Sequence, residues 1–282
     1  DFLAFASELK GLSQLQSPIY PVDPGYIIGS NQQSSRFYNF ERVLARSTEV
    51  YSEAYYIQEL NSLIKKVVKD NIRPSEHIVA FLSGGIDSSI ITAIAKDHIK
   101  NLHVYSIGVE GSRDITHAKL YTQKYNLKHT IIEIQLEDLL QAIPDVIYTL
   151  ESFDAALIRS AVPMYILSKH MYELEHPEVV LTGEGGDELF GGYDYLKKLS
   201  DEEEFNNELF DLLNVEHKTG LQRVDRIPYH FSIEARAPLF DRRLVEFALQ
   251  IPPSLKIKEM TGDKIEKYIL RKAFESELPE EI

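Results

Sequence analysis

A short apolar run, Ile78–Leu82, leads directly into the sequence Ser83-Gly84-Gly85-Ile86-Asp87-Ser88-Ser89. Consecutive apolar residues predict a strand that is buried on both faces. The pattern after the turn predicts a helix over residues 88–99, and the two glycines allow the backbone to turn sharply between strand and helix. The segment therefore predicts the strand–turn–helix unit from which α/β folds are built.

The alternation of strand and helix continues along the chain. Apolar runs predict strands at 102–109, 130–134 and 179–182, and apolar periodicity predicts helices at 52–70, 115–125, 137–150 and 161–175. From about residue 201 onward the pattern is wholly helical. We therefore predict an α/β fold in which helices flank a parallel sheet, followed by an all-helical C-terminal part.

The first 47 residues differ from the rest. They contain short runs typical of strands, at Phe2–Ala6 and at 18–28, with turn residues at Pro21, Pro24 and Gly25. We predict a β-rich segment over residues 1–47 and a separate α/β domain over residues 48–282.

Charge and cysteine content exclude several classes of function. Lys and Arg number 30 against 44 Asp and Glu, a net charge of -14, which repels a phosphate backbone and argues against a nucleic-acid partner. Cysteine is absent, so these residues form no disulfide, thiolate nucleophile or zinc–sulfur site. No apolar run approaches the roughly 20 residues that span a bilayer. With no signal-peptide pattern either, we predict a cytoplasmic protein without a membrane partner.

The glycine-rich turn has the chemistry of an anion site. Ser83, Ser88 and Ser89 offer hydroxyl donors, and the N–H groups of the following helix point out of its N-terminus. Asp87 fits such a site if it holds Mg²⁺, which bridges carboxylate and phosphate oxygens. The lysine-containing P-loop pattern is absent. The alternative is a plain glycine-rich turn in which Asp87 caps the helix.

A second loop, Leu181–Tyr193, also follows a predicted strand and contains five glycines and three carboxylates. Such a composition indicates a backbone that must fit closely around a ligand. The carboxyl ends of parallel strands share one edge of the sheet, where ligands bind. Asp187 is therefore expected to meet the same Mg²⁺ as Asp87, with Glu184 and Tyr193 as proton-transfer or hydrogen-bonding groups nearby.

These motifs carry a family resemblance. The first resembles the pyrophosphate-binding loop of the ATP pyrophosphatase superfamily, which cleaves ATP into AMP and pyrophosphate. The second is similar to the G-E-G-[SG]-D-E-[LV]-F-G-G-Y segment of glutamine-dependent asparagine synthetases. The resemblance implies an adenine nucleotide α-hydrolase-like fold and a carbon–nitrogen ligase. Its expected reaction is adenylation of the aspartate side chain, with ATP and Mg²⁺, followed by attack of ammonia to give asparagine.

The resemblance also implies roles for individual residues. The expected contacts to ATP and pyrophosphate are Phe81, Leu82, Ser83, Gly84, Gly85, Asp87, Ser88, Ser89, Ile107, Thr182 and Gly183. Asp87 and Asp187 are expected to bind the metal. Glu184, Tyr193 and Arg159 are expected to be catalytic.

The likeness extends to both ends of the chain. Residues 1–47 look like the last part of a glutaminase-type domain, which implies glutamine as the source of ammonia, and a homodimer is possible. The sequence Lys267–Ala273 matches the family's late K-x-x-L-R helix. We expect a further lysine of the family, which stabilises charge at the adenylate step, to lie beyond residue 282. Because the glutaminase nucleophile is a cysteine, the 282 residues alone are expected to use free ammonia or nitrogen from another chain.

One departure leaves the substrate open. Ala156 and Leu157 stand where bacterial relatives have two threonines, in the segment Asp154–Arg159 that resembles the aspartate site. The alternatives are therefore aspartate activation, activation of a different carboxylate as in the related β-lactam synthetases, and a nucleotide-binding regulatory protein without turnover.

Overall fold

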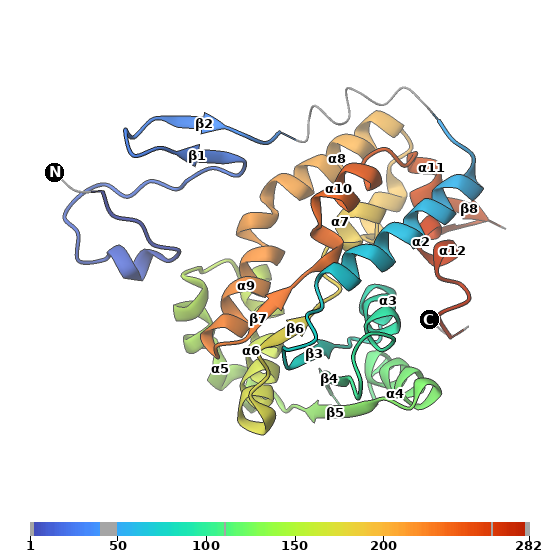
Figure 1. Ribbon diagram of the computed structural model, residues 1–282, viewed down its shortest axis with the longest axis horizontal. Helices are drawn as coiled ribbons and strands as arrows, with labels where there is room; N and C mark the ends of the chain where they lie inside the picture. The colour runs from blue at the N-terminus through green and yellow to red at the C-terminus, as the bar shows by residue number, and fades with distance from the viewer. Residues whose placement is uncertain (1–2, 40–49, 110, 261, 280–282) are drawn as a thin grey trace.

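The computed structural model describes residues 3–39, 50–109, 111–260 and 262–279 (Figure 1). Its centre is a five-stranded sheet in the order β5-β4-β3-β6-β7, and every pairing in it is parallel. The strands are β3 (Ile78–Phe81), β4 (His103–Gly108), β5 (Lys128–Glu133), β6 (Val179–Leu181) and β7 (Glu234–Arg236). The predicted α/β fold with a parallel sheet flanked by helices is confirmed.

Helices cover both faces of the sheet. Successive residues of a strand point to opposite faces, and on both faces the apolar side chains pack against helices. Ala80 and Val104 pack with one set of helices, and Val79 and Tyr105 face the other side. The first set comprises α2 (Glu53–Asp70), α3 (Ile86–Ala95), α4 (Arg113–Tyr125), α10 (Arg242–Ala248) and α12 (Tyr268–Ala273). The second comprises α5 (Leu136–Leu150), α6 (Ala155–Glu175) and α9 (Gly220–His230).

The part after residue 201 is not wholly helical, so that prediction is wrong. It contains α8 (Glu202–Val215) and α11 (Pro253–Lys256), but also β7 and a hairpin of β8 (Lys258–Met260) and β9 (Asp263–Ile265). Strand β7 has three residues, Glu-Ala-Arg, too few for an apolar alternation to show in the sequence. It is held by pairing with β6 and by Arg236, which is buried and bonds the Glu76 carboxylate.

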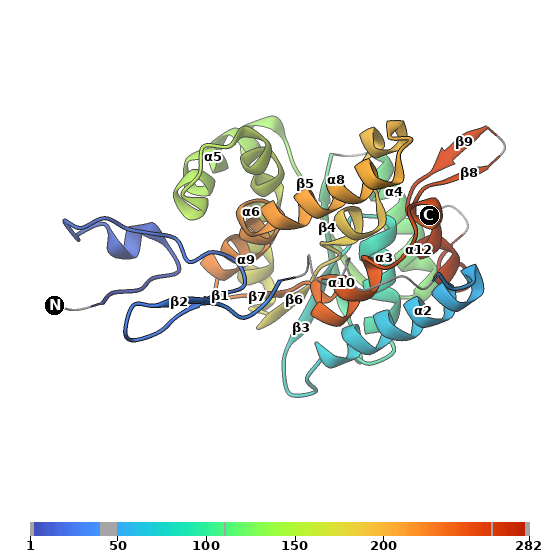
Figure 2. The same ribbon diagram turned by 90° about the horizontal axis from the view of Figure 1, so that it is seen from above.

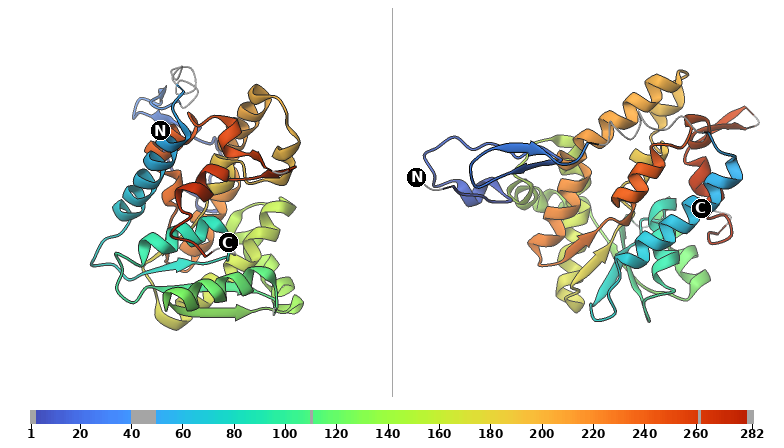
Figure 3. Two further views of the ribbon diagram at one scale, coloured as in Figure 1. Left: turned by 90° about the vertical axis from the view of Figure 1, so that its right-hand side faces the viewer. Right: turned by 45° about the horizontal axis from the view of Figure 1, so that its top comes forward.

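The N-terminal segment projects away from the sheet (Figures 2 and 3). It contains a 3₁₀ helix (Leu9–Leu12) and a hairpin of β1 (Tyr26–Ile28) and β2 (Ser34–Arg36). The expected strand at 2–6 is not formed by residues 3–6, and Phe2 lies outside the described residues. The segment contacts the α/β domain through the Glu151 carboxylate, which accepts bonds from the N–H groups of Leu9 and Lys10. The boundary proposed at 47/48 also lies outside the described residues.

Among the helices of the described ranges, none combines the length and the apolar character needed to cross a membrane.

Candidate active site

The two glycine-rich loops meet at the carboxyl ends of β3 and β6. The chain leaves these neighbouring strands toward opposite halves of the sheet, which opens a crevice between the loops that follow them. Gly183 in the second loop packs against the first turn of α3, where a Cβ atom would lie 2.5 Å from the Ser88 nitrogen. Because backbone atoms on α3 cannot retreat independently, only glycine fits this contact.

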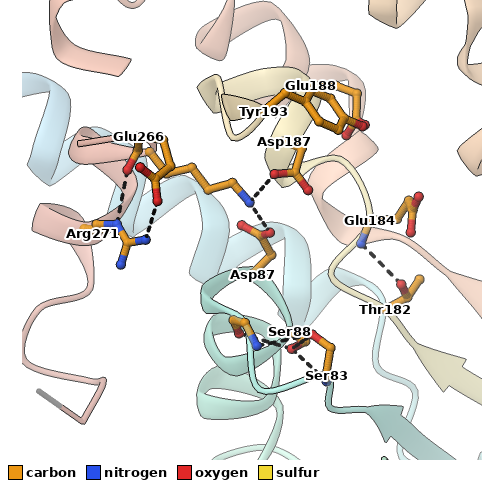
Figure 4. Close-up of polar contacts among 12 residues, drawn as sticks. Ser83, Asp87, Ser88, Thr182, Glu184, Asp187, Glu188, Tyr193, Glu266 and Arg271 are labelled. Carbon is orange, nitrogen blue, oxygen red and sulfur yellow. Dashed lines mark hydrogen bonds and ion pairs between the residues drawn. The ribbon is translucent and has the colours of Figure 1, made fainter. Parts of the chain in front are cut away.

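The first loop wraps around its own hydroxyl groups. The Ser83 and Ser88 Oγ atoms lie 2.9 Å apart, the Ser83 N–H donates to Ser88 Oγ at 3.1 Å, and the Gly85 N–H donates to Ser83 Oγ at 3.3 Å (Figure 4). Gly84 has φ +86°, and a Cβ there would lie 2.2 Å from the Asp114 carbonyl oxygen. The loop therefore gathers hydroxyl and N–H donors at the N-terminus of α3, as an anion site requires. Ser89, predicted as one of these donors, is fully buried in the helix and does not line the cavity described next.

A cavity of about 720 Å³ lies between the loops, α6 and the α8–α9 junction. One end is largely apolar, and its walls come from the strand ends and α6: Phe81, Leu82, Ile107, Pro163, Met164 and Leu167. The other end is rich in charged and polar side chains, among them Glu184, Glu188, Tyr193, Glu216, Thr219 and Arg223. Ser83, Asp87, Ser88, Thr182, Gly183 and Asp187 lie in its lining as well.

Asp87 and Asp187, the two residues predicted to share a metal, converge on one cation in the structure. In the structure this cation is the Lys267 amine, 2.5 Å from Asp87 Oδ2 and 2.7 Å from Asp187 Oδ1 (Figure 4). Burial raises the pKa of Asp87 to about 6, although the positive charge of Lys267 opposes this rise. The Oδ1 atom of Asp87 is buried and finds no hydrogen-bond partner in the described part of the chain. Asp87 and Asp187 thus place carboxylate oxygens around one position, and Oδ1 of Asp87 is available as a further acceptor. Oxygen atoms of this kind are the ligands that Mg²⁺ prefers.

Lys267 is a site residue that the sequence did not identify by role. It caps the N-terminus of α12 with φ 54°, a left-handed conformation that is uncommon outside glycine, and it is nearly buried. Sequence analysis identified Lys267 only as the first residue of a family-like helix. No local pattern indicates that its amine reaches Asp87, 180 positions earlier in the chain.

The second loop supplies two polar pairs. The Tyr193 hydroxyl donates to the Glu188 carboxylate, and burial raises the pKa of Glu188 to about 7. Glu184 pairs with Arg223 of α9. Sequence reasoning missed Arg223, since an arginine in the amphipathic segment Gly220–His230 is typical of an exposed helix face.

Only part of the predicted aspartate segment lines the cavity. Asp154 caps α6, where its Oδ1 accepts from the Leu157 N–H at 2.7 Å, and it lines the cavity with Ala156 and Leu157. Arg159 is exposed on α6 and is not among the residues that line the cavity. The cationic side chain at this end of the cavity is Arg223 instead.

The chain was compared with models of protein families. A family model described as asparagine synthase matches residues 59–210 and 197–282. The chain belongs to the asparagine synthase family. The resemblance that the two glycine-rich motifs indicated is thereby confirmed.

Individual family members are moderately similar to the chain. The root asparagine synthetase (glutamine-hydrolyzing) of Pisum sativum is 32% identical over 283 residues, covering 96% of this chain and 48% of that protein. Asparagine synthetase (glutamine-hydrolyzing) 2 of Arabidopsis thaliana is 31% identical over 284 residues, covering 97% and 48%. The chain thus spans about half the length of these curated relatives.

Solved structures give more distant likenesses. An NH3-dependent NAD synthetase from Campylobacter jejuni aligns with a TM-score of 0.33 and 19% identity, over 60% of this chain and 76% of its own. A glutamine-dependent NAD+ synthetase from Acinetobacter baumannii, in complex with ADP, aligns with a TM-score of 0.34 and 16% identity, over 72% and 44%. At this similarity neither comparison bears on the activity.

Proposed function

We propose that this chain adenylates the side-chain carboxylate of aspartate with ATP and that ammonia then converts the acyl-adenylate into asparagine. The observation that carries the proposal is the convergence of Asp87 and Asp187 beside the Ser83–Ser88 donors, in the lining of one cavity. Charge develops on pyrophosphate as it leaves, and fixed donors and cations at that point lower the barrier.

The shape of the cavity supports one placement of ATP. The apolar end, with Phe81, Leu82 and Ile107, suits the adenine ring, and Thr182 and Gly183 lie beside the path of the phosphates. The loop 83–88 then receives the β- and γ-phosphates. This placement leaves the end around Glu184 and Arg223 for the carboxylate substrate.

Asp87 and Asp187 are the residues that would hold Mg²⁺. When bound, Mg²⁺ neutralises charge on the phosphate oxygens. The Lys267 amine, which lies between the two carboxylates, would pair with a phosphate of the leaving pyrophosphate.

The proposed reaction has two displacements. A carboxylate oxygen attacks the α-phosphorus, the bond from the α-phosphorus to the bridging oxygen breaks, and pyrophosphate leaves. Ammonia then attacks the acyl carbon, the bond to AMP breaks, and the nitrogen loses a proton. Tyr193 and Glu188 line the cavity and form a hydrogen-bonded pair that accepts this proton, while Glu184 and Arg223 orient the acyl group.

We further propose that residues 1–47 are the end of a glutaminase-type domain and residues 48–282 the synthetase domain. The relatives of which this chain spans half are named glutamine-hydrolyzing, which supports glutamine as the source of ammonia in a longer chain. The projecting N-terminal segment, with exposed Phe5, Tyr20 and Phe37, is in keeping with that division.

A second candidate is adenylation of a different carboxylate, as in the β-lactam synthetases. Ala156 and Leu157 line the cavity, so its wall offers a methyl and an isobutyl group where bacterial relatives have hydroxyls. A bulkier or more apolar substrate would match that wall.

Exchange of labelled pyrophosphate into ATP tests the proposal, since only reversible adenylation returns label to ATP. The purified chain is incubated with Mg-ATP, labelled pyrophosphate and one carboxylate at a time. Aspartate-dependent exchange supports aspartate activation, and exchange with another carboxylate alone supports the second candidate. No exchange with any carboxylate, in a protein that includes the lysine expected beyond residue 282, contradicts both.

A further inference from the structure

Glu216 is a buried carboxylate that the proposed reaction does not use. It ends α8 at the turn before α9, is 5% exposed and lines the polar end of the cavity. Its Oε1 accepts the Thr219 hydroxyl at 3.0 Å, while its Oε2 is buried and has no hydrogen-bond partner in the ranges that the structure describes. A buried oxygen of this kind is costly unless a donor reaches it.

Capping of α9 accounts for only one of the two carboxylate oxygens of Glu216. Burial raises the pKa of Glu216, and the Thr219 hydroxyl and the N–H of Leu221 oppose this rise, as expected beside a helix N-terminus. Neither of them bonds Oε2. That atom instead lies 2.5 Å from the point where a Cβ of Gly220 would stand, and Glu184 Oε1 lies 2.5 Å from the same point.

The two converging carboxylates differ in their partners. Glu184 is paired with Arg223, but no ion pair to Glu216 is formed within the described residues. Arg223 has one donor without an acceptor, because its Nε is buried and forms no hydrogen bond within the described residues. The polar end of the cavity therefore holds an unused acceptor on a carboxylate and an unused donor on a guanidinium.

We propose that these atoms recognise the two ends of an amino-acid zwitterion: Glu216 Oε2 accepts from the α-ammonium group, and Arg223 Nε donates to the α-carboxylate. This inference rests on the proposed adenylating function and deepens it, because it assigns the residues that distinguish aspartate from carboxylates without an α-ammonium or α-carboxylate group. The side-chain carboxylate is then the group left to point along the cavity toward the α-phosphorus.

The assignment explains how the site selects a substrate without the two threonines. Ala156 and Leu157 offer no side-chain donors or acceptors, so the polar contacts that fix the substrate come from the opposite wall, through Glu216 and Arg223. Charge also fits, because the ammonium group meets a carboxylate that forms no ion pair within the described residues.

Substrate analogues test the proposal with the unaltered protein. Succinate is aspartate without the ammonium group, and β-alanine is aspartate without the α-carboxylate. Pyrophosphate exchange with the wild-type chain should prefer aspartate over each analogue by roughly 10- to 100-fold in kcat/KM, the size of one lost charge-assisted hydrogen bond. Equal exchange with aspartate and succinate overturns the role of Glu216.

The variant Glu216→Gln completes the test, because its amide oxygen still accepts the Thr219 hydroxyl and the fold is retained. It should lower the preference for aspartate over succinate to within about threefold and leave the preference for aspartate over β-alanine unchanged. Glu203→Gln, an exposed change on helix α8, which Glu216 caps, is the matched control and should alter neither ratio. A Glu216→Gln variant with the wild-type preference over succinate contradicts the proposal.

One further comparison shows which ammonium group Glu216 binds, the α-ammonium group of the substrate or a free ammonium ion. If Glu216 instead holds the attacking ammonia as ammonium ion, Glu216→Gln raises the KM for ammonium in amide synthesis and leaves the aspartate-to-succinate ratio intact, which overturns the zwitterion assignment. If the wild-type chain shows no exchange with aspartate or any other carboxylate, the proposed function fails. These two failures are therefore distinguishable.

Discussion

A substitution at Gly192 tests whether the positions of Asp187 and Lys267 matter for activity, and it should leave the fold intact. A Cβ at this position would stand 1.8 Å from Asp187 Oδ1 and 2.2 Å from Lys267 Cε. Contacts of a Cβ below 3.0 Å are essentially never found, so the Asp187 oxygen must retreat by about 1.2 Å in Gly192→Ala. Both displaced atoms belong to flexible side chains, and the φ of Gly192 lies outside the left-handed region.

The expected result is a loss of activity with little loss of stability. A displacement of about 1 Å at a reacting centre costs on the order of 10²-fold in rate, so aspartate-dependent pyrophosphate exchange should fall by about that factor. The melting temperature should stay within a few degrees, since alanine is compatible with the backbone there.

Gly262→Ala is the opposite control for this prediction. Gly262 has φ +91° and no neighbour within 4 Å of an added Cβ, so this variant should lose about 1 kcal/mol of stability and keep its exchange rate. Exchange by Gly192→Ala within threefold of the wild type would refute the argument that Asp187 and Lys267 must hold their positions.

Three other predictions follow from the same structure. Gly183→Ala should lower the melting temperature markedly, because its Cβ meets backbone atoms of α3 and neither loop can yield; an unchanged melting curve contradicts this. Burial lowers the pKa of His129 to about 4, so the unfolded chain binds a proton below pH 6.5 that the fold does not. The contribution of His129 to stability should therefore fall as the pH drops from 7 to 5. Denaturant unfolding should show that over this range the wild type loses up to about 2 kcal/mol relative to His129→Gln. Finally, Arg223→Ala should raise the KM for aspartate at least tenfold and Arg159→Ala less than twofold, because only Arg223 lines the cavity; the reverse order would restore the original assignment of Arg159.

The local parts of the site could be predicted from the sequence. The turn after Phe81 and the glycine-rich loop after Leu181 each join a strand to a helix, so their position at one sheet edge follows from the parallel order. The approach of Asp87 to Asp187 was predicted on this ground, and the structure places them on one cation.

The distant parts of the site could not be predicted. Arg223 and Glu216 line the cavity, and Lys267 reaches Asp87, from segments whose packing depends on the whole domain. No short motif around them indicates a ligand. Arg159 shows the converse limit. Its segment resembles a substrate site, but the rotation of α6 decides which side chains face the cavity, and Arg159 lies on the exposed side.

The origin of the oxygen in AMP tests the central claim most directly. Aspartate labelled with ¹⁸O in its side-chain carboxylate is incubated with the protein, Mg-ATP and ammonium, and the products are separated and analysed by mass spectrometry. Because the carboxylate oxygen bonds to the α-phosphorus and stays there when ammonia attacks carbon, the account predicts one ¹⁸O in AMP and none in pyrophosphate, with no labelled AMP from Asp87→Asn. Release of ADP and phosphate, with the label in phosphate, would contradict adenylation at this site.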